Sequence, residues 1–382
     1  MTQKEFHDRL KEDAMYRRHL EETDQPFIDD LEKRMKHPFR YYQREALAAL
    51  NFFMTIPETI KYPFKEEIIE RDYGNIPFYG FEMATGSGKT LLIGATIAHL
   101  HQGQGYKNFL LITPNKTIYD KTIRNFDLTH KDCVFSNNLG LKYNLVTGDN
   151  YMDKSSGFDE SADINIFVFN IQKFFDTDAG TRKVDKAWEE SCWKDGRGNT
   201  IPLRQFLQKE KLVIVTDEAH HYQNFKVSNR NKSSGDVIID LKPEVVLEYT
   251  ATAVLEDTVR RRQKIIYKYD ISSFIDDGYS KKVRAFGYSG FVDKQESHDV
   301  TIDDKKKIIT TILFHMLKKK ALENEDMKSI ILVRGRGIPH IEAVYDYVIN
   351  ELPEDDEIIE ETYNELYHGT EYETLALIKV IG

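Results

Sequence analysis

A short glycine-rich loop between two apolar segments constrains the fold of this chain more than any other feature. Residues 76–81 predict a buried strand, and residues 91–98 predict a packed helix. Between them, residues 83–90 read Met-Ala-Thr-Gly-Ser-Gly-Lys-Thr. In a strand, loop and helix of this kind, the loop N–H groups and the positive end of the helix point to one place. The segment therefore predicts a cradle for phosphate groups.

The loop residues predict how such a cradle would hold a nucleotide. Lys89 would reach the β- and γ-phosphates, and the Thr90 hydroxyl would bind Mg²⁺. Four residues would surround the phosphates: Thr85, Gly86, Ser87 and Gly88. The two glycines would let the backbone approach oxygen atoms that a Cβ atom would touch. Met83 stands where the general phosphate-loop pattern has glycine, so an ordinary glycine-rich turn is the alternative interpretation.

Apolar runs alternate with helical patterns along the next part of the chain and predict an α/β fold. The runs lie at residues 109–112, 143–146, 164–169, 212–216 and 245–249. The unbroken apolarity of these runs favours burial on both faces, as in a parallel sheet. Polar motifs follow the runs, which is where open α/β sheets bind their ligands.

The run at 212–216 leads into Asp217-Glu218-Ala219-His220. Asp217 would hold Mg²⁺, and Glu218 would orient and deprotonate an attacking water. His220 would hydrogen-bond toward the nucleotide or toward Thr250 and Thr252. An ordinary helix start with acidic first-turn residues is the alternative, because the helix dipole favours acids there. Together with the phosphate loop, the tetrad predicts ATP hydrolysis with Mg²⁺ as the metal.

A motif ahead of the loop predicts contact with the base of the nucleotide. Tyr42 and Gln43 lie at the start of an amphipathic helix. The Gln43 amide offers a donor and an acceptor, which suits the edge of adenine, and an aromatic beside it can stack on the base. A plain helix start is the alternative interpretation.

Composition limits the class of protein. The chain has 382 residues, enough for two domains with substantial cores. Its 53 basic and 63 acidic residues give a net charge of −10, so nucleic acid would bind at a local basic groove. Two cysteines cannot build a disulfide framework, and no run reaches the roughly 18 apolar residues of a membrane span. The start of the chain also lacks the apolar core of a signal peptide, and we expect a cytoplasmic protein with no membrane partner.

Four segments are predicted. Residues 1–37 would be a solvated helical extension, interrupted near Pro26, and residues 38–256 the first ATP-binding domain. Residues 257–280 would be a linker, and residues 281–382 a partial second α/β domain.

Further patterns lie inside these segments. In the second domain, strands are expected near 283–288 and 329–333, and helices near 303–320 and 338–352. In the first domain, residues 57–77 read as a loop-rich insertion. Residues 175–208 read as a charged insertion without an assigned role.

The motifs stand in the order found in superfamily two helicases and translocases: Tyr42-Gln43, Met83 to Thr90, Thr113-Pro114-Asn115, Asp217 to His220 and Thr250-Ala251-Thr252. The chain most resembles the ATPase (Res) subunit of type III restriction enzymes and is also similar to the type I restriction motor. The resemblance covers about residues 36–256 well. It implies a RecA-like parallel-sheet ATPase domain followed by a second, apparently incomplete RecA-like domain, with ATP between them.

The same resemblance implies residue roles and partners. Thr250 and Thr252 would couple hydrolysis to movement. Four residues would touch the nucleic-acid backbone: Thr113, Asn115, Thr147 and Gly148. Such contacts carry little sequence information. The implied partners are double-stranded DNA and modification or specificity subunits, and the implied activity is an ATP-dependent motor of a restriction or DNA-defence system.

The sequence departs from that family in its second half. A finger motif of the form Gln-x-x-Gly-Arg-x-x-Arg is missing from the sequence. An arginine finger contributes about 10³-fold or more to turnover, so we expect weak turnover from this chain alone. The second lobe is short, so the chain looks cut off, and no nuclease site is recognisable. Two other functions remain open: an RNA helicase acting on single strands, and a nucleotide-gated binding module without catalysis.

Overall fold

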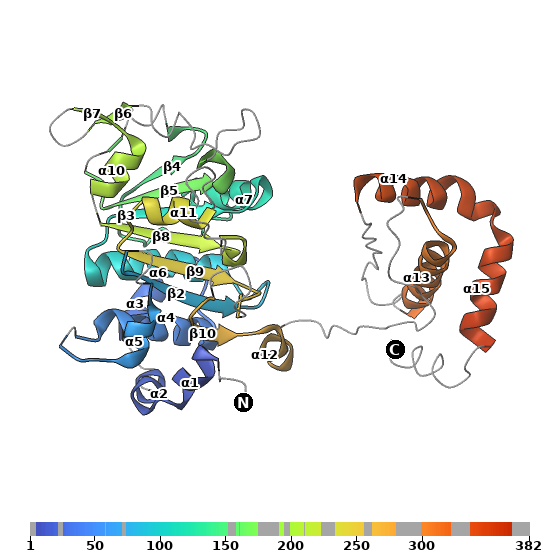
Figure 1. Cartoon of the computed structure of the whole chain (residues 1–382), viewed down its shortest axis with the longest axis horizontal. Coiled ribbons are helices and arrows are strands. Elements are labelled where there is room, and N and C mark those ends of the chain that lie inside the picture. Colours follow the sequence, from blue (N-terminus) through green and yellow to red (C-terminus); the bar gives the residue numbers. More distant parts are fainter. Residues whose placement is uncertain are drawn as a thin grey trace. The chain divides into compact units, whose positions relative to one another are not determined.

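The computed structural model consists of two compact units, Met1–Lys282 and Val283–Gly382 (Figure 1). The structure describes residues 5–21, 26–57, 59–70, 74–151, 158–159, 161–174, 191–194, 199–209, 211–222, 234–255, 262–279, 299–321 and 337–368. Each unit is described by itself.

The first unit is built on a mostly parallel sheet with the order β1-β2-β9-β8-β3-β5-β4, and β10 also pairs with β2. Its strands are β1 (Ile69–Glu70), β2 (Ile76–Met83), β3 (Asn108–Thr113), β4 (Tyr143–Thr147), β5 (Ile164–Asn170), β8 (Leu212–Asp217), β9 (Val245–Thr250) and β10 (Ile265–Tyr269). Only β1 pairs antiparallel among these described strands. The six strands expected from the sequence and the α/β class are confirmed.

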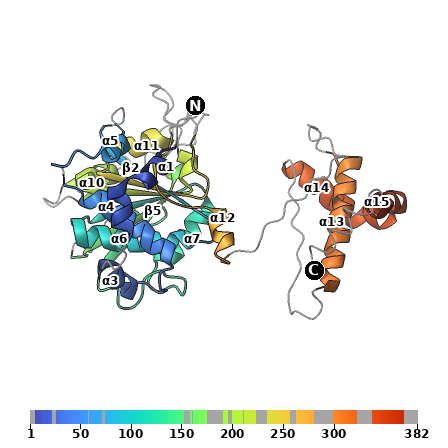
Figure 2. The same cartoon turned by 90° about the horizontal axis from the view of Figure 1, so that it is seen from below.

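Helices cover both faces of this sheet (Figure 2). One face carries α4 (Tyr41–Thr55), α6 (Lys89–Gln104) and α7 (Lys116–Phe126), and the other carries α10 (Leu203–Lys209) and α11 (Ser234–Asp240). Each face of the sheet has its own hydrophobic core, and alternate residues of β8 pack into the two cores. Val213 and Val215 belong to the first core, and Leu212 and Ile214 belong to the second. The prediction that this strand is buried on both faces is therefore confirmed.

The N-terminal helices are part of the core, which corrects the expectation of a solvated extension. They are α1 (Phe6–Glu12), α2 (Ala14–Glu21) and α3 (Pro26–Arg34), so Pro26 begins a helix. Leu10 and Leu31 are fully buried. The Tyr16 hydroxyl donates to the Ile266 carbonyl of β10 at 2.6 Å. Charged residues dominate the sequence there, but a narrow apolar stripe is enough to bury one helix face.

Residues 257–280, expected to be a linker, contain a strand of the sheet and a helix. β10 pairs parallel with β2, and its residues Ile265 and Ile266 are buried. Helix α12 (Ile271–Asp276) follows, with the Asp270 side chain as its N-cap. The strand is short and contains Lys268, so composition alone did not distinguish it from a connection.

The two expected insertions also carry regular structure. Residues 57–77 include α5 (Pro63–Ile68) and β1, which pairs with the start of β2. Within 175–208, β6 (Ser191–Lys194) and β7 (Thr200–Pro202) form a small antiparallel pair. Trp193 of β6 is buried against Phe158 and Phe206, so this segment extends the second core. The rest of that insertion up to residue 190 lies outside the described residues.

The described part of the second unit is helical. It contains α13 (Ile302–Ala321), α14 (Ile338–Asp346), η5 (Tyr347–Glu351), η6 (Leu352–Glu354) and α15 (Asp356–His368). Its small core includes Ile308, Val344 and Tyr347. The strands expected near 283–288 and 329–333 lie outside the described residues, so the second RecA-like domain stays a prediction. None of the described helices in either unit has the length and apolarity needed to cross a membrane.

Candidate active site

The strand order brings motifs from distant parts of the chain to one edge of the sheet. Strand β9 lies between β2 and β8, and the three run parallel. Their carboxyl ends therefore lie side by side. The phosphate loop follows β2, Thr250 ends β9, and Asp217 ends β8. This is the edge at which parallel α/β sheets bind ligands.

The phosphate loop turns through two left-handed glycines. Gly86 and Gly88 both have φ of +84°, a conformation that costs other residues free energy. A Cβ atom at Gly88 would lie 2.5 Å from Nε2 of Gln43. The positive φ favours glycine at position 88, and a side chain there would also displace the Gln43 amide. The loop then enters α6, with Gly88 as its N-cap.

Lys89 and Glu218 meet across the strand ends. The Lys89 Nζ atom lies 3.8 Å from Oε1 of Glu218 and donates to the Met83 carbonyl at 3.3 Å. Thr90 and Asp217 line one small cavity together with Thr113. The structure therefore brings together all four side chains that the sequence assigned to phosphate, metal and water.

The two acids differ in environment. Burial, and then the charge of Glu218, raise the pKa of Asp217, and the Lys89 ammonium opposes them. The Glu218 N–H donates to Oδ1 of Asp217 at 3.0 Å. Glu218 itself has φ of +53°, which strains a residue with a side chain. A turn bent in this way directs the Glu218 carboxylate back toward Lys89.

His220 connects the acids to β9. Its Nδ1 atom lies 3.0 Å from the Thr250 hydroxyl and 3.6 Å from Oε2 of Glu218. The Thr250 hydroxyl also accepts from the Thr252 N–H at 3.0 Å. Thr250 is fully buried. Of the two directions that the sequence left open for His220, the structure has the one toward Thr250.

The loop residues fit a phosphate group. The Ser87 hydroxyl is buried and has no hydrogen-bond partner among the described residues. Its neighbours Thr85, Gly86 and Gly88 are exposed. Lys89 supplies a positive charge at the same place, and the helix N-terminus adds to it. The donors needed by a triphosphate are thus present, and Thr90 and Asp217 offer oxygen ligands of the kind that Mg²⁺ prefers.

Tyr42 and Gln43 support the phosphate loop in this structure. The Gln43 Nε2 atom donates to the carbonyls of Ser87 and Gly88 at 3.1 and 3.3 Å, and its Oε1 atom accepts from the Arg40 N–H. The Tyr42 hydroxyl donates to the Ser87 carbonyl at 3.0 Å. The Tyr42 ring is fully buried, so it does not offer a face to a base as expected. Adenine reading by Gln43 stays a prediction.

Three of the four residues expected to touch nucleic acid are buried. The Thr113 hydroxyl donates to the Phe169 carbonyl at 3.4 Å, and Thr147 and Gly148 form a closed turn. Only Asn115 of this group is exposed, and its side chain caps α7 by accepting from the Ile118 N–H. Thr113 is the last residue of β3 and pairs with Asn170 of the neighbouring strand β5, which explains its burial.

Sequence reasoning missed Tyr269 of β10. Its ring stacks on Tyr42 with 3.8 Å between centroids, and its carbonyl accepts from the Ala84 N–H at the start of the phosphate loop. The Tyr269 and Tyr41 hydroxyls both donate to Asp277. The run of β-branched and aromatic residues in Ile-Ile-Tyr-Lys-Tyr at 265–269 was the signal that could have identified this strand.

Comparison with known families agrees with this geometry. The family model described as "Type III restriction enzyme, res subunit" matches residues 36–255, more than half of the chain. The chain belongs to this family. The resemblance inferred from the motifs is therefore confirmed.

A curated member of the type III restriction group resembles most of the chain. The protein named "Probable type III restriction-modification enzyme HindVIP Res subunit", from Haemophilus influenzae, is 25% identical over 375 residues. The match covers 87% of this chain and 64% of the relative, so the chain spans about two thirds of that protein's length.

Two solved structures are also similar to this chain. One is the Sulfolobus solfataricus SWI2/SNF2 ATPase core in complex with dsDNA, with a TM-score of 0.33, 16% identity, and coverage of 59% of this chain and 34% of that one. The other is a nuclease-deletion mutant of the Type ISP restriction-modification enzyme LlaGI in complex with a DNA substrate mimic. Its TM-score is 0.31 at 12% identity, with coverage of 79% and 29%.

Proposed function

We propose that this chain hydrolyses ATP with Mg²⁺ and couples hydrolysis to movement on double-stranded DNA in a type III restriction system. The observation that carries the proposal is the convergence of Lys89 with Glu218 and of Thr90 with Asp217. Family membership supports the restriction setting, and the name of the Haemophilus influenzae relative supports a modification subunit as partner.

Each residue has a distinct task in this proposal. ATP with Mg²⁺ would supply the phosphoanhydride bond and a divalent charge at the leaving group. The ammonium of Lys89 would move from Glu218 to phosphate oxygens, which leaves the Glu218 carboxylate available to orient and deprotonate water. Asp217 and Thr90 would hold the metal. When ATP occupies the site, Lys89 would pair with phosphate and would no longer pair with Glu218, the proposed base.

His220 and Thr250 would transmit a structural change from the site of hydrolysis to the end of β9. The Glu218, His220 and Thr250 side chains form a continuous chain of contacts. A change at Glu218 would therefore reach the end of β9, from which Thr252 and the following segment continue. This supports the coupling role expected for Thr250 and Thr252.

ATP hydrolysis by the purified chain, alone and with duplex DNA, tests the proposal. Lys89→Ala is expected to lower the rate by about 100-fold or more, because it removes a charge aimed at the phosphates. Lys107→Ala is the matched control, since Lys107 is an exposed lysine just before β3, at the other end of that strand. Hydrolysis by Lys89→Ala at the parent rate would contradict the proposal.

Nucleic-acid preference and strength of turnover have separate tests. Stimulation by duplex DNA and not by single-stranded RNA supports the DNA motor, and the reverse result supports an RNA helicase. Because the sequence lacks the finger motif, we expect the DNA-stimulated rate of this chain to be weak. Strong DNA-stimulated hydrolysis by the purified chain would contradict this expectation. A chain that binds ATP and shows no hydrolysis under any condition would favour the non-catalytic binding module.

A further inference from the structure

Four consecutive residues at the start of α4 join the phosphate loop to the segment that follows β10. Tyr42 and Gln43 bond to backbone carbonyls of the loop. The two residues before them, Arg40 and Tyr41, contact residues 277–279 instead. A displacement of either segment can therefore be transmitted to the other through this short stretch of backbone.

Helix α12 and the turn after it lie against the phosphate loop. Phe274 of α12 is 4% exposed, and its Cε1 atom lies 3.8 Å from the position of a Cβ atom at Gly86. Gly278 is left-handed, and the Tyr279 N–H donates to the Phe274 carbonyl at 3.1 Å. The Arg40 guanidinium lies 4.1 Å from the centre of the Tyr279 ring. Isolated helices of six residues are unstable in water, so the position of α12 depends on contacts of this kind.

Asp277, at the end of α12, accepts two hydrogen bonds on one carboxylate oxygen. Its Oδ2 atom accepts from the Tyr269 hydroxyl at 2.5 Å and also from the Tyr41 hydroxyl. The bond from Tyr269, and then the bond from Tyr41, lower the pKa of Asp277. The carboxylate is therefore ionised near pH 7, and hydrogen bonds to an ionised acceptor are stronger than those between neutral groups.

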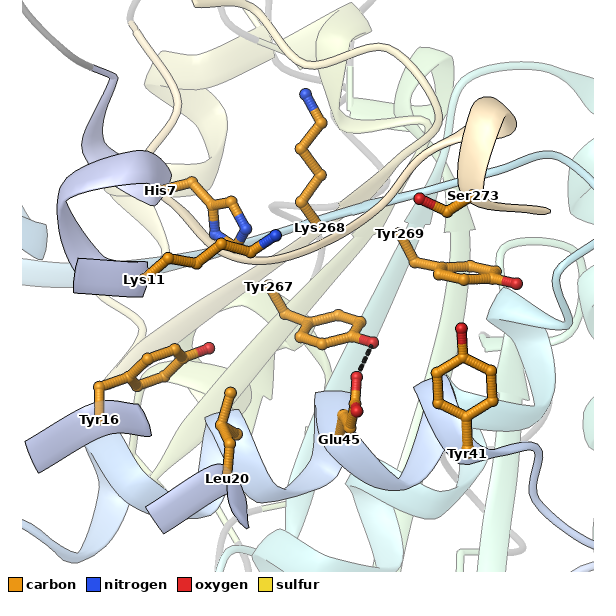
Figure 3. A pocket seen from close by; sticks show the side chains of 10 residues that line it. All are labelled: His7, Lys11, Tyr16, Leu20, Tyr41, Glu45, Tyr267, Lys268, Tyr269 and Ser273. Carbon is orange, nitrogen blue, oxygen red and sulfur yellow. Dashed lines mark hydrogen bonds between the residues drawn. The ribbon is translucent and has the colours of Figure 1, made fainter. Parts of the chain in front are cut away.

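Packing alone does not enclose the two tyrosines. Tyr41 belongs to α4 and is 48% exposed, and its hydroxyl points toward Tyr269 of β10 (Figure 3). A pocket of about 170 Å³ borders both residues. Because the packing is open on that side, the bonds to Asp277 contribute to the orientation of the two rings.

Tyr269 in turn supports the phosphate loop. Its ring stacks on Tyr42 with 3.8 Å between centroids, and the Tyr42 hydroxyl donates to the Ser87 carbonyl at 3.0 Å. The Tyr269 carbonyl accepts from the Ala84 N–H at 2.8 Å. Asp277 is thus connected to the loop by one route through these rings and by a second route through α12.

We propose that Asp277 is a positioning residue for the phosphate loop. Its bonds to Tyr41 and Tyr269 hold α12 and the start of α4 together, so the loop keeps the conformation described above before nucleotide binds. Such preorganisation raises affinity, because less ordering remains to be done on binding. Coupling between two sites is reciprocal, so bound nucleotide also stabilises α12. The inference rests on the proposed function only in taking this loop as the ATP site.

Hydrogen–deuterium exchange of the ligand-free chain, followed by mass spectrometry, tests the positioning without nucleotide. Asp277→Ala should raise the exchange rate of residues 83–88 about ten-fold, because it removes the acceptor of two charge-assisted bonds. Residues 108–113 of β3 should exchange at the parent rate. Asp276→Ala is the matched control, since Asp276 is the exposed acid next to Asp277, and it should change neither segment.

Two results of this experiment would overturn the proposal. One is unchanged exchange of residues 83–88 in Asp277→Ala. The other is an equal increase in residues 108–113, which would indicate a general loss of structure. Asp277→Asn keeps an oxygen that can accept both hydroxyl bonds but removes the charge, so its exchange rate should lie between those of the parent and Asp277→Ala.

A double-mutant cycle tests the route through Tyr269. Tyr269→Phe removes one of the hydroxyls that bond to Asp277 and keeps the ring that stacks on Tyr42. Once Asp277→Ala is present, that hydroxyl has lost the same bond, so adding Tyr269→Phe should change the exchange rate less than about two-fold. Independent effects that multiply would contradict this route.

Binding of a non-hydrolysable ATP analogue with Mg²⁺ connects the positioning to the ATP site. Asp277→Ala should raise the Kd about ten-fold and leave the maximal rate of hydrolysis within about three-fold, because the proposed catalytic groups are unchanged. An unchanged Kd would overturn the proposal. A parent chain that does not bind the analogue would contradict the proposed function, whereas the exchange experiment would still decide whether Asp277 positions the loop.

Discussion

The ammonium of Lys89 lies 3.8 Å from the carboxylate of Glu218, although the two residues follow different strands of the sheet. Their side chains are 10% and 22% exposed, so the pair is largely shielded from water. Strand β9 separates the two strands and contributes Thr250 to the same edge. The sheet order, and not proximity in sequence, therefore creates the site.

The first prediction concerns the backbone of the phosphate loop. Gly88→Ala should lower the affinity for an ATP analogue at least about ten-fold, because the new Cβ atom would displace the Gln43 amide from the Ser87 and Gly88 carbonyls that it holds. Gly105→Ala is the matched control, since Gly105 is also left-handed but has nothing within 4 Å of its Cβ position. Calorimetric titration measures the affinity. Equal losses in both variants would mean that backbone strain alone explains the effect.

The second prediction concerns pH and Asp217. Its pKa is raised in the folded chain, so the folded state holds the proton more tightly than the unfolded state does. Ionisation therefore removes stability as the pH rises from the usual value of 3.8 through the raised pKa. Asp217→Asn should raise the Tm of the ligand-free chain at pH 7.5, with a gain that shrinks toward pH 3.8, and should abolish the response to Mg²⁺. A lower Tm at pH 7.5 would contradict the assigned cause of the shift.

The third prediction concerns coupling. Thr250→Val keeps the shape of the side chain and removes the hydroxyl that contacts His220 and Thr252. It should reduce DNA-stimulated hydrolysis by about ten-fold and reduce basal hydrolysis less. Thr96→Val is the control, because Thr96 is buried and bonds to the Tyr249 hydroxyl on the same strand β9. Equal losses of both rates in Thr250→Val would show that Thr250 acts in hydrolysis and not in coupling.

The fourth prediction concerns the N-terminal helices. Leu10→Ala should lower the free energy of unfolding by about 2–4 kcal/mol, because Leu10 is fully buried. Met15→Ala, at a side chain that is 43% exposed, should change it by less than about 0.5 kcal/mol. Urea denaturation measures both. A small effect of Leu10→Ala would support the solvated extension that the sequence suggested.

The sequence predicted what depends on continuous apolar runs and on local motifs. The six long strands and the phosphate loop follow from such local signals, and the ends of parallel strands then bring Lys89 near Asp217 and Glu218. Burial of the N-terminal helices and pairing of β10 depend on partners distant in sequence, which periodicity does not specify. Tyr42 and Thr113 were misplaced for the same reason: their motifs are local, but Tyr269 stacks on Tyr42 and β5 pairs with Thr113.

The left-handed conformation of Glu218 also could not be predicted from the sequence. Nothing in Asp-Glu-Ala-His distinguishes a strained turn from an ordinary helix start, because acids favour both. The strain is maintained by the surrounding contacts, including the bond from the Glu218 N–H to Asp217. Its position at the proposed base agrees with the tendency of strain to concentrate at functional sites.

Glu218→Gln tests the central claim most directly, because it keeps the size of the side chain and removes the proposed base. Nucleotide binding and single-turnover hydrolysis are measured on the same preparation with Mg²⁺ and duplex DNA. The account predicts that the variant binds ATP within about three-fold of the parent and hydrolyses it about 100-fold or more slowly. Hydrolysis at the parent rate would contradict the account.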